Sequence, residues 1–292
     1  MDKKSILLML DSDALSSVFD RIVAIDGGAE VVLAHADVQL NQVQGLVHGC
    51  IFTRSPKDLH QTAIFIGGSN VEIAETLFAE VKKTFLPNYG LTVSIMMDAN
   101  GCNTTAASAV RLAGAHMALK GTQALVLGGT GPVGERVGLL LAYEGVSVRL
   151  ASRTLDRARL ATSRITAQLS GLPGPSPVAV ASPLEVSEAA KGCSLVISCG
   201  AAGVPFVSLN SLSVIPGLRL VMDLNGVPPL GILGIDPSDK ARERDGVVCF
   251  GSIGVGGLKI KLHRACIAKL YESNKENLEI EQIYALSKVI TH

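Results

Sequence analysis

The chain of 292 residues has no tryptophan, only seven phenylalanines and four tyrosines, and no excess of charge of either sign. Lysine plus arginine and aspartate plus glutamate each number 26, so no net positive charge attracts nucleic acid or an anionic membrane. The few aromatic rings leave little for stacking on nucleic-acid bases. We therefore expect neither a nucleic-acid partner nor a membrane partner.

Long apolar runs and paired cysteines are also missing. Residues 6–10 are apolar, but Asp11 ends a run too short for the core of a secretion signal. No stretch of about twenty apolar residues could span a membrane. The cysteines form no Cys-x-x-Cys pair and are expected to be reduced and mostly buried. These absences predict a soluble, cytoplasmic protein without a metal site. The cysteines are Cys50, Cys102, Cys193, Cys199, Cys249 and Cys266.

Thirty glycines and 48% hydrophobic residues are typical of packed α/β layers. The length suits about two domains. Strand-like and helix-like segments alternate through the first hundred residues, with strands expected at 5–10, 30–34, 49–53, 63–67 and 91–97. We predict an open α/β domain followed by a Rossmann-type domain, with a boundary at Lys120-Gly121-Thr122.

Residues 124–154 carry the strongest motif: a strand, a glycine turn, a helix, a glycine stop and a second strand. Gly129, Gly131 and Gly134 fill the three glycine positions of a dinucleotide-binding fingerprint. They are expected to form the turn, to let the pyrophosphate approach, and to pack the helix on the strand. The helix N-terminus would face the phosphates. The predicted cofactor residues of this turn are Gly129, Thr130, Gly131, Pro132, Val133 and Gly134.

The end of the second strand indicates which dinucleotide binds. It reads Ser152-Arg153-Thr154, with no carboxylate before Asp156. An acid would bind the ribose 2′-hydroxyl of NAD, whereas hydroxyls and a guanidinium suit the 2′-phosphate of NADP. The sequence thus predicts NADP, with NAD as the weaker alternative. A solvated arginine at a strand end is the other interpretation of Arg153, and Arg157 on the next helix is as readily a surface residue.

Three further segments place polar or small residues after strands or before helices. Gly200 and Ala201 follow the fourth strand of the second domain, where they are expected near the nicotinamide. Residues 98–105 follow a strand and begin a helix, so Asn103 or Thr104 either caps that helix or lies beside a ligand. Residues 11–13 show the same ambiguity, and no further ligand completes a metal site there.

The glycine-rich residues 251–257 are expected to lead into a helix at 258–270. Lys259 and Lys261 would then lie near its first turn, against the helix dipole, which suggests an anionic or electron-rich ligand for Lys259 and solvent for Lys261. His263 and Cys266 lack the other ligands of a zinc site and are interpreted as packing residues.

Together these segments resemble, over essentially the whole chain, the bacterial NADP-dependent methylenetetrahydromethanopterin dehydrogenases. The resemblance implies oxidation of a methylene-tetrahydropterin to its methenyl form, hydride transfer to NADP, a role in one-carbon oxidation in the cytoplasm, and a homo-oligomer. Whether tetrahydrofolate is accepted stays open. The matching stretches are Asp26–Gly28, Thr62–Gly68, Asp98–Ala106, Gly129–Gly134, Pro228–Ile232 and Gly256–Leu270.

The resemblance also implies a pterin site in the cleft between two domains. Residues 1–120 and 258–292 would form the pterin domain, with the C-terminal helices packed back on it, and residues 121–257 the NADP domain. Asn100, Thr104 and Asp98 are assigned to the pterin site, and Lys259 to the catalytic position near the reacting carbon.

Two other functions stay open at this point. A shikimate-dehydrogenase-like or glutamyl-tRNA-reductase-like enzyme would also place a substrate domain before an NADP domain, but it needs an acid–base residue or a nucleophile. Cys50 and Cys102 are the thiol candidates, and neither has an obvious histidine partner. A non-enzymatic NADP-binding protein would bind the cofactor without turnover.

Overall fold

A computed structural model describes residues 3–290 and divides into two compact units. Unit 1 contains the chain up to Thr104 and from Ile260 onward, and unit 2 is Thr105–Lys259. Two helices run through the division, α4 (Cys102–His116) and α9 (Ser252–Lys269). Met1, Asp2, Thr291 and His292 lie outside the described residues.

Unit 1 contains a five-stranded parallel sheet with the order β14-β4-β3-β1-β2. Buried parallel strands are apolar throughout rather than alternating, and all six residues of β3 are buried. The strands are β1 (Ile6–Asp11), β2 (Val31–His35), β3 (Thr62–Gly67), β4 (Ser94–Met97) and β14 (Asn277–Leu278).

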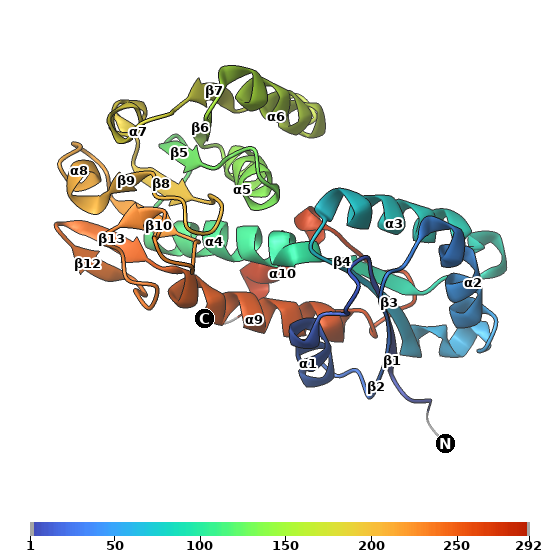
Figure 1. Cartoon of the computed structure of the whole chain (residues 1–292). Helices are drawn as coiled ribbons and strands as arrows, with labels where there is room; N and C mark the ends of the chain where they lie inside the picture. Colours follow the sequence, from blue (N-terminus) through green and yellow to red (C-terminus); the bar gives the residue numbers. More distant parts are fainter. Residues whose placement is uncertain (1–2, 291–292) are drawn as a thin grey trace. The chain divides into compact units, whose positions relative to one another are not determined.

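Helices cover both faces of this sheet, as Figure 1 shows. One face carries α1 and the C-terminal half of α9, which pack so closely that a Cβ on Gly27 would lie 2.7 Å from Ile267. The other face carries α2 and α3, which contact each other. The helices are α1 (Val18–Asp26), α2 (Leu40–Ile51), α3 (Val71–Thr84) and α10 (Ile280–Val289), with short 3-10 turns η1 (Pro56–Gln61), η2 (Pro87–Tyr89) and η3 (Ala99–Gly101).

The C-terminal segment returns to unit 1, as expected. β14 pairs with β4, and the Ser94 hydroxyl donates to the Ser273 carbonyl at 2.9 Å. The strand expected at 49–53 is wrong, because those residues end α2. Val43, Val47, Cys50 and Ile51 are buried at helical spacing, and that period overrides the β-branched and aromatic residues nearby.

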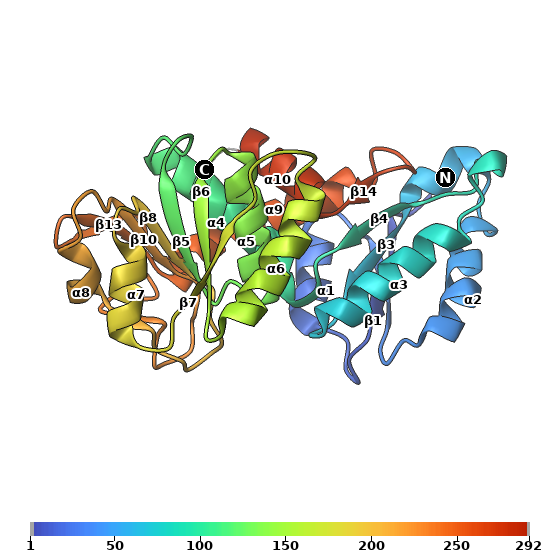
Figure 2. The same ribbon diagram turned by 90° about the horizontal axis from the view of Figure 1, so that it is seen from above.

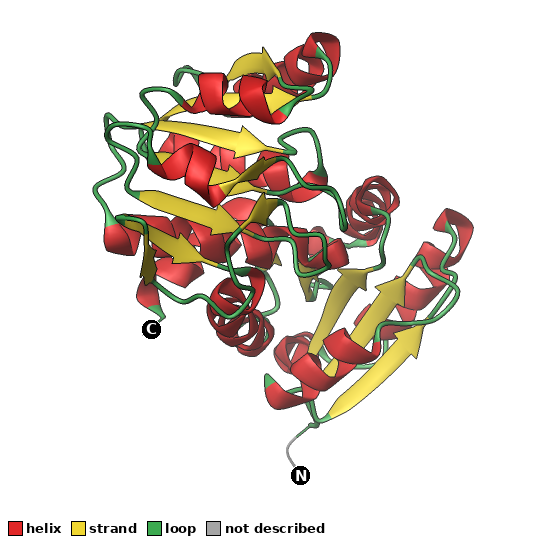
Figure 3. Cartoon of the chain, turned by 60° about the vertical axis from the view of Figure 1, so that its left-hand side comes forward, coloured by secondary structure: helices red, strands yellow, loops and turns green. Residues whose placement is uncertain are grey.

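Unit 2 contains a seven-stranded sheet with the order β12-β13-β10-β8-β5-β6-β7, parallel except for β12. Without β12, this is the strand order of a Rossmann fold, so the predicted fold class is confirmed. The arrows in Figure 3 show the common strand direction. The strands are β5 (Gln123–Leu127), β6 (Ser147–Ser152), β7 (Ser176–Ala179), β8 (Leu195–Ser198), β10 (Leu220–Asp223), β12 (Arg242–Arg244) and β13 (Val247–Phe250), with a separate pair β9 (Val207–Ser208) and β11 (Ile232–Leu233).

The helices of unit 2 follow the same alternation. α5 and α6 lie side by side in Figure 2 and contact each other, and α7 contacts α8. A buried cluster that includes Leu127, Val196 and Val221 forms the core beneath α7 and α8. The helices are α5 (Pro132–Tyr143), α6 (Leu155–Gln168), α7 (Pro183–Ala190) and α8 (Leu209–Ser213).

One strand and one helix boundary near unit 2 are worth noting. β7 includes Pro177, which is tolerated because β7 is the last strand of its sheet. The helix expected to begin at Leu258 begins at Ser252, so the glycines at 254–257 are helical. In the described part of the chain no helix is both long and apolar enough to cross a bilayer.

Candidate active site

The carboxyl ends of β5, β6 and β8 meet at a pocket of about 250 Å3. β5 lies between β6 and β8, where the strand order of the sheet reverses, and doubly wound sheets bind ligands at such points. The other predicted cofactor residues, Gly129, Pro132, Val133, Gly134 and Thr154, belong to the same two turns but do not line the pocket. The predicted residues that line it are Thr130, Gly131, Ser152, Arg153, Gly200 and Ala201.

The glycine turn after β5 is shaped by close backbone contacts. Gly128 has a φ of +65°, and a Cβ there would lie 2.6 Å from the Gly200 Cα. A Cβ on Gly134 would lie 2.7 Å from the Gly129 Cα, which is the close packing expected of the third glycine. The left-handed residue of the turn is therefore Gly128, whereas Gly129 is needed for its approach to Leu150 on β6.

Gly131 has a different reason to be glycine. A Cβ there would meet its nearest atom, the Gly128 carbonyl oxygen, at an ordinary 3.5 Å. Gly131 is also the N-cap of α5, where no side chain caps the helix and Pro132 begins it. The first N–H groups of a helix bind phosphate well. The open space at Gly131 therefore suits a phosphate lying against the backbone.

Two guanidinium groups lie at the end of β6. Arg153 and Arg157 are both exposed, and both line the pocket, so Arg157 belongs with the site rather than with the outer surface. Asp156, the nearest acid, forms an ion pair with Arg159 at 3.3 Å. A glycine-lined turn followed by two cations fits the pyrophosphate and 2′-phosphate of NADP.

The end of β8 contributes Cys199 and Gly200. Burial, and next the carboxylate of Asp223, raise the pKa of the Cys199 thiol. A Cβ on Gly200 would overlap the ring of Phe206. Since only a thiolate is a strong nucleophile, Cys199 contributes a small neutral wall to the pocket rather than a reactive group.

In unit 1 the sheet order reverses around β1 and β3, and polar residues follow β1, β3 and β4. Asp98, directly after β4, accepts hydrogen bonds from the N–H groups of Asn103 at 2.9 Å and Thr104 at 3.0 Å. The Thr104 hydroxyl donates to its other oxygen at 2.5 Å. All three residues are buried. The cap of α4 is therefore Asp98, not Asn103 or Thr104, and its carboxylate orders the turn.

Asn100 differs from the other two residues assigned to the pterin site. It is exposed, its φ is +52°, and its N–H donates to the Gly68 carbonyl at 2.7 Å. Left-handed backbone at a non-glycine residue costs energy and is concentrated at functional sites, although asparagine tolerates it best. Of these three side chains, Asn100 is the one that a ligand can reach.

His263 lies beneath this turn as a buried packing residue. Its ring is fully buried and stacks on Phe65, with 5.4 Å between centroids. Its Nδ1 lies 3.9 Å from Asp98 and 4.0 Å from Asp20. The ring on α9 therefore lies close to α1 and to the carboxylate of Asp98, at distances longer than those of hydrogen bonds.

The acids after β1 hold loops in the same way. Asp11 accepts the N–H groups of Asp13 and Ser17, and Asp13 accepts the N–H and hydroxyl of Ser69. Residues 11–13 therefore order the loop between β1 and α1. Across residues 3–290 no group of three metal-ligating side chains is found.

Comparisons with known proteins show which family the chain is similar to. A family model described as "Methylene-tetrahydromethanopterin dehydrogenase, N-terminal" matches residues 18–100. The "Bifunctional protein MdtA" of Methylorubrum extorquens is 42% identical over 287 residues, 98% of each chain. The "NAD(P)-dependent methylenetetrahydromethanopterin dehydrogenase" of the same organism is 31% identical over 282 residues, 93% of each chain.

The chain belongs to the methylenetetrahydromethanopterin dehydrogenase family. Among solved structures it is similar to 5-ketofructose reductase of Gluconobacter (TM-score 0.56, 13% identity, 98% of each chain). It is also similar to quinate dehydrogenase of Corynebacterium glutamicum (TM-score 0.53, 14% identity, 97% of this chain and 99% of that one). At this identity the structures show a shared fold only.

Membership of the methylenetetrahydromethanopterin dehydrogenase family confirms the resemblance and the expectation of a nicotinamide-dependent enzyme. It decides against the shikimate-dehydrogenase-like alternative and the non-enzymatic one. The cysteines agree with this, since burial raises the pKa of Cys50 to about 12, and Cys102 is fully buried.

Lys259, which the family resemblance places at the catalytic position, is half-buried in α9. Because α9 begins at Ser252, Lys259 lies in its third turn, and the argument from the dipole of the first turn is wrong. Lys259 precedes His263 by four residues on the continuous helix α9, so the two side chains lie on one face of that helix.

The sequence gives no signal for Gly128 or Asp20, and it leaves Arg157 open between the cofactor site and the surface. Gly128 precedes the fingerprint by one position, and only its φ distinguishes it from Gly129. Asp20 lies 243 positions before His263 in the chain, and no local spacing indicates that contact.

Proposed function

We propose that this protein is an NADP-dependent methylenetetrahydromethanopterin dehydrogenase that converts the methylene adduct to the methenyl form. The observation that carries the choice of NADP is that Arg153 and Arg157 line the same pocket as the glycine turn. NAD remains a weaker alternative, because Ser152 and Thr154 suit either ribose.

The reaction needs little acid–base chemistry. The methylene carbon lies between two pterin nitrogens, whose lone pairs stabilise the cation left when the C–H bond breaks with its electron pair. When bound, the nicotinamide ring supplies the acceptor for that hydride, and the products are the methenyl cation and NADPH. The protein has to hold the two reactants at roughly 3–3.5 Å and exclude water.

Each part of the pocket has one task in this proposal. Gly131 and the first N–H groups of α5 bind the pyrophosphate, while Ser152, Arg153 and Thr154, with Arg157, bind the 2′-phosphate. The backbone at Gly200 and Ala201 lies beside the nicotinamide. Gly129, Thr130, Pro132, Val133 and Gly134 form the turn that presents these groups.

The pterin is assigned to residues near the start of α4. Asn100 is exposed and contacts the ligand, whereas Asp98 and Thr104 are buried and position the turn. Lys259 binds the pterin or shapes the electrostatic field near the reacting carbon, and it accepts no proton. Tetrahydrofolate adducts share the reacting group and are a second substrate to test.

The first test is a spectrophotometric assay of the purified protein with methylene-tetrahydromethanopterin and either NADP or NAD. Formation of the methenyl absorbance together with NADPH would establish the activity and rank the cofactors. Binding of NADP without turnover would leave the dinucleotide site standing and overturn the pterin substrate. The same assay with methylene-tetrahydrofolate decides the second substrate.

Lys259→Ala tests the assignment of the lysine. We expect kcat/KM for the pterin to fall while the Kd for NADP stays unchanged. Lys261→Ala, an exposed lysine two residues on, is the matched control. An unchanged kcat/KM in Lys259→Ala would remove Lys259 from the site.

The family resemblance also motivates two further parts of the proposal, namely that the protein is located in the cytoplasm and that it forms a homo-oligomer. Each is tested directly, the first by cell fractionation and the second by the mass of the purified protein.

A further inference from the structure

The pocket at the glycine turn accounts for one half of a dinucleotide. Its lining comes from the ends of β5, β6, β7 and β8, and it includes Arg153 and Arg157, which suit the 2′-phosphate on the adenosine side. A Rossmann sheet consists of two mononucleotide-binding halves, and the dinucleotide lies across the point where they meet. The other half of this sheet is formed by β8, β10 and β13. We therefore expect the nicotinamide half of NADP at the carboxyl ends of these three strands.

Two segments follow the ends of β10 and β13. Residues 224–231 form a loop after β10, and Ser252 begins α9 after β13. Asp223, at the end of β10, is buried and accepts the N–H groups of Asn225 at 3.1 Å and of Ile232 at 2.8 Å. One carboxylate thus holds the loop at both ends, so the loop is ordered by the chain itself.

The hydroxyl of Ser252 has no hydrogen-bond partner within the described part of the chain, although its Oγ is buried. A serine at the start of a helix usually caps it by accepting an N–H group of the first turn. Here the Gly254 N–H donates to the Pro237 carbonyl at 3.2 Å, and the Val255 N–H donates to the Gly251 carbonyl at 3.0 Å. A buried polar group without a partner costs free energy. The hydroxyl therefore indicates a partner that is not part of the chain.

Gly226, in the loop after β10, leaves space next to this hydroxyl. A Cβ on Gly226 would lie 3.1 Å from the Ser252 Oγ and 3.6 Å from the Ser252 Cβ, and among the described residues beyond its chain neighbours it would meet nothing else within 4 Å. The backbone of Gly226 is not left-handed, so its conformation does not require glycine. Glycine is also used where a ligand approaches the backbone closely. The space at Gly226 and the hydroxyl of Ser252 therefore belong to one candidate site.

Apolar side chains flank this polar group. Val227 follows Gly226 and is 53% exposed, and Ile253 follows Ser252 and is 68% exposed. Nicotinamide is a planar ring with apolar faces and one carboxamide, which needs hydrogen-bond partners once water is excluded. Ligand sites for such molecules combine apolar side chains with a few placed polar groups. Two exposed apolar side chains beside one unpaired hydroxyl have this combination.

We propose that the Ser252 hydroxyl binds the carboxamide of the nicotinamide, beside the backbone of Gly226, and so fixes the orientation of the ring that accepts the hydride. The inference rests on the NADP cofactor of the proposed function and adds a cofactor-binding residue to it. The hydroxyl can donate to the carboxamide oxygen or accept from the carboxamide NH2 group. Either bond restricts rotation of the ring, so that the ring is held in one orientation toward the substrate.

The test compares the binding of NADP with that of adenosine 2′,5′-bisphosphate, which contains the 2′-phosphate but no nicotinamide. Calorimetry on the full chain gives both Kd values for wild type and Ser252→Ala. We expect Ser252→Ala to raise the Kd for NADP roughly three- to tenfold, because one hydrogen bond is lost, and to leave the Kd for adenosine 2′,5′-bisphosphate unchanged. Ser252→Thr keeps the hydroxyl and should restore most of the affinity for NADP.

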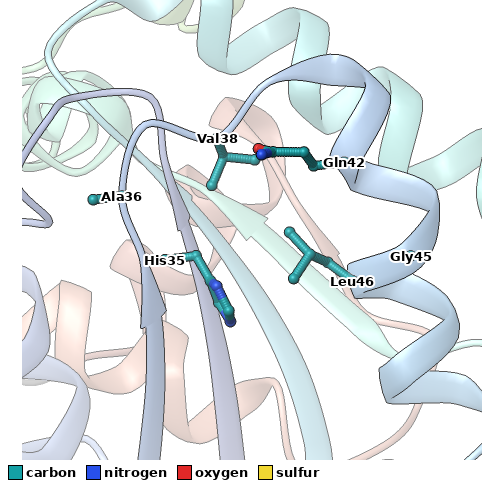
Figure 4. Close-up of a pocket in the computed structure, with 6 residues that line it drawn as sticks. All are labelled: His35, Ala36, Val38, Gln42, Gly45 and Leu46. Atoms are coloured by element: carbon teal, nitrogen blue, oxygen red, sulfur yellow. The ribbon is translucent and has the colours of Figure 1, made fainter.

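An NADP analogue with pyridine in place of nicotinamide tests the carboxamide directly. Wild type should bind this analogue roughly three- to tenfold more weakly than NADP, whereas Ser252→Ala should bind the two nearly equally. Gly226→Ala places a methyl group against the same hydroxyl and should weaken the binding of NADP alone. Gly45→Ala on α2 is its control, because Gly45 borders the open recess shown in Figure 4, where a Cβ would meet no atom within 4 Å.

The outcomes separate this inference from the proposed function. If wild type binds no NADP, both the cofactor of the proposed function and this inference are wrong. If wild type and Ser252→Ala bind NADP equally well, only the assignment of Ser252 is wrong, and the site at the glycine turn remains. An equal loss of affinity for NADP and for adenosine 2′,5′-bisphosphate in Ser252→Ala would give the residue a structural role and would also overturn the inference.

Discussion

The two sheets differ at the point where their strand order reverses. In unit 2 the chain has glycines at this point, which leave space, whereas in unit 1 it has polar side chains that fill the space. Gly128, Gly131 and Gly200 leave a pocket in unit 2. In unit 1 the carboxylates of Asp11 and Asp98 are buried and accept hydrogen bonds from backbone N–H groups, and Asp98 also accepts the Thr104 hydroxyl. Phosphates can be bound by backbone N–H groups alone, whereas the turn in unit 1, to which the proposed function assigns the pterin, is held by buried side chains.

Of the substitutions that compare the two regions, we expect Gly134→Val in unit 2 to have the largest effect on stability and on NADP binding. The added side chain would meet the backbone of Gly128 and Gly129, which cannot move away. We expect a loss of stability on the order of 4 kcal/mol together with loss of NADP binding, measured by urea unfolding and calorimetry.

Gly131→Ala is the matched control for the glycine turn. Its Cβ fits the fold, so the unfolding midpoint should stay within error while the Kd for NADP rises. Equal loss of stability in both variants would contradict the assignment of Gly131 to ligand approach.

Asp98→Ala should have the second largest effect, on stability. It leaves the N–H groups of Asn103 and Thr104 and the Thr104 hydroxyl without their buried acceptor, which we expect to cost about 3 kcal/mol. Asp13→Ala removes a more exposed acceptor and should cost less. Equal midpoints in denaturant for the two variants would show that the Asp98 network does not hold the turn.

Arg153→Ala should reduce the preference for NADP over NAD roughly 10- to 100-fold, because one charge-assisted contact to the 2′-phosphate is lost. The ratio of kcat/KM values for the two cofactors is the measurement. Arg242→Ala, an exposed arginine on β12, is the control. If Arg153→Ala keeps the wild-type ratio, Arg153 does not bind the 2′-phosphate.

Asn100→Ala should raise KM for the pterin roughly tenfold, with little change in the unfolding midpoint or in KM for NADP. Asn100→Gly relieves the left-handed backbone and removes the same amide. If only the alanine variant is impaired, the residue serves the backbone turn and not the ligand.

The smallest effect concerns Asp239 and Arg244 of unit 2, which are joined by two hydrogen bonds at 2.6 and 2.7 Å. Burial by itself raises the pKa of Asp239, but the bonds from Arg244 and from the Asp236 N–H outweigh it, and the net pKa is lowered. A lowered folded pKa stabilises the fold above the unfolded value near 4 and loses that effect as pH falls further. The difference in Tm between wild type and Arg244→Ala should therefore shrink below pH 4, and a constant difference would exclude the ion pair as its cause.

Much of the fold could be predicted from local patterns. The apolar period of residues 71–84 is typical of an amphipathic helix, and in the structure the Asn70 side chain accepts the Ile73 N–H as the N-cap of α3. Where a local cue conflicted with longer-range packing, prediction failed. Gly254 indicated a loop, yet it lies inside α9, and glycine is needed there because a Cβ would overlap the backbone of Asp239.

The sequence by itself determined the two α/β units, the dinucleotide turn, the cationic end of β6 and membership of the family. Each of these depends on the types and spacing of residues that are adjacent in the chain. Only the tertiary structure decided that Asp98 rather than Asn103 or Thr104 caps α4, and that Arg157 joins Arg153. It also brought His263 between Asp20 and Asp98 and left β2 at the edge of its sheet. These last features depend on contacts between segments far apart in the chain, and no local period or spacing encodes which carboxylate a buried side chain will meet.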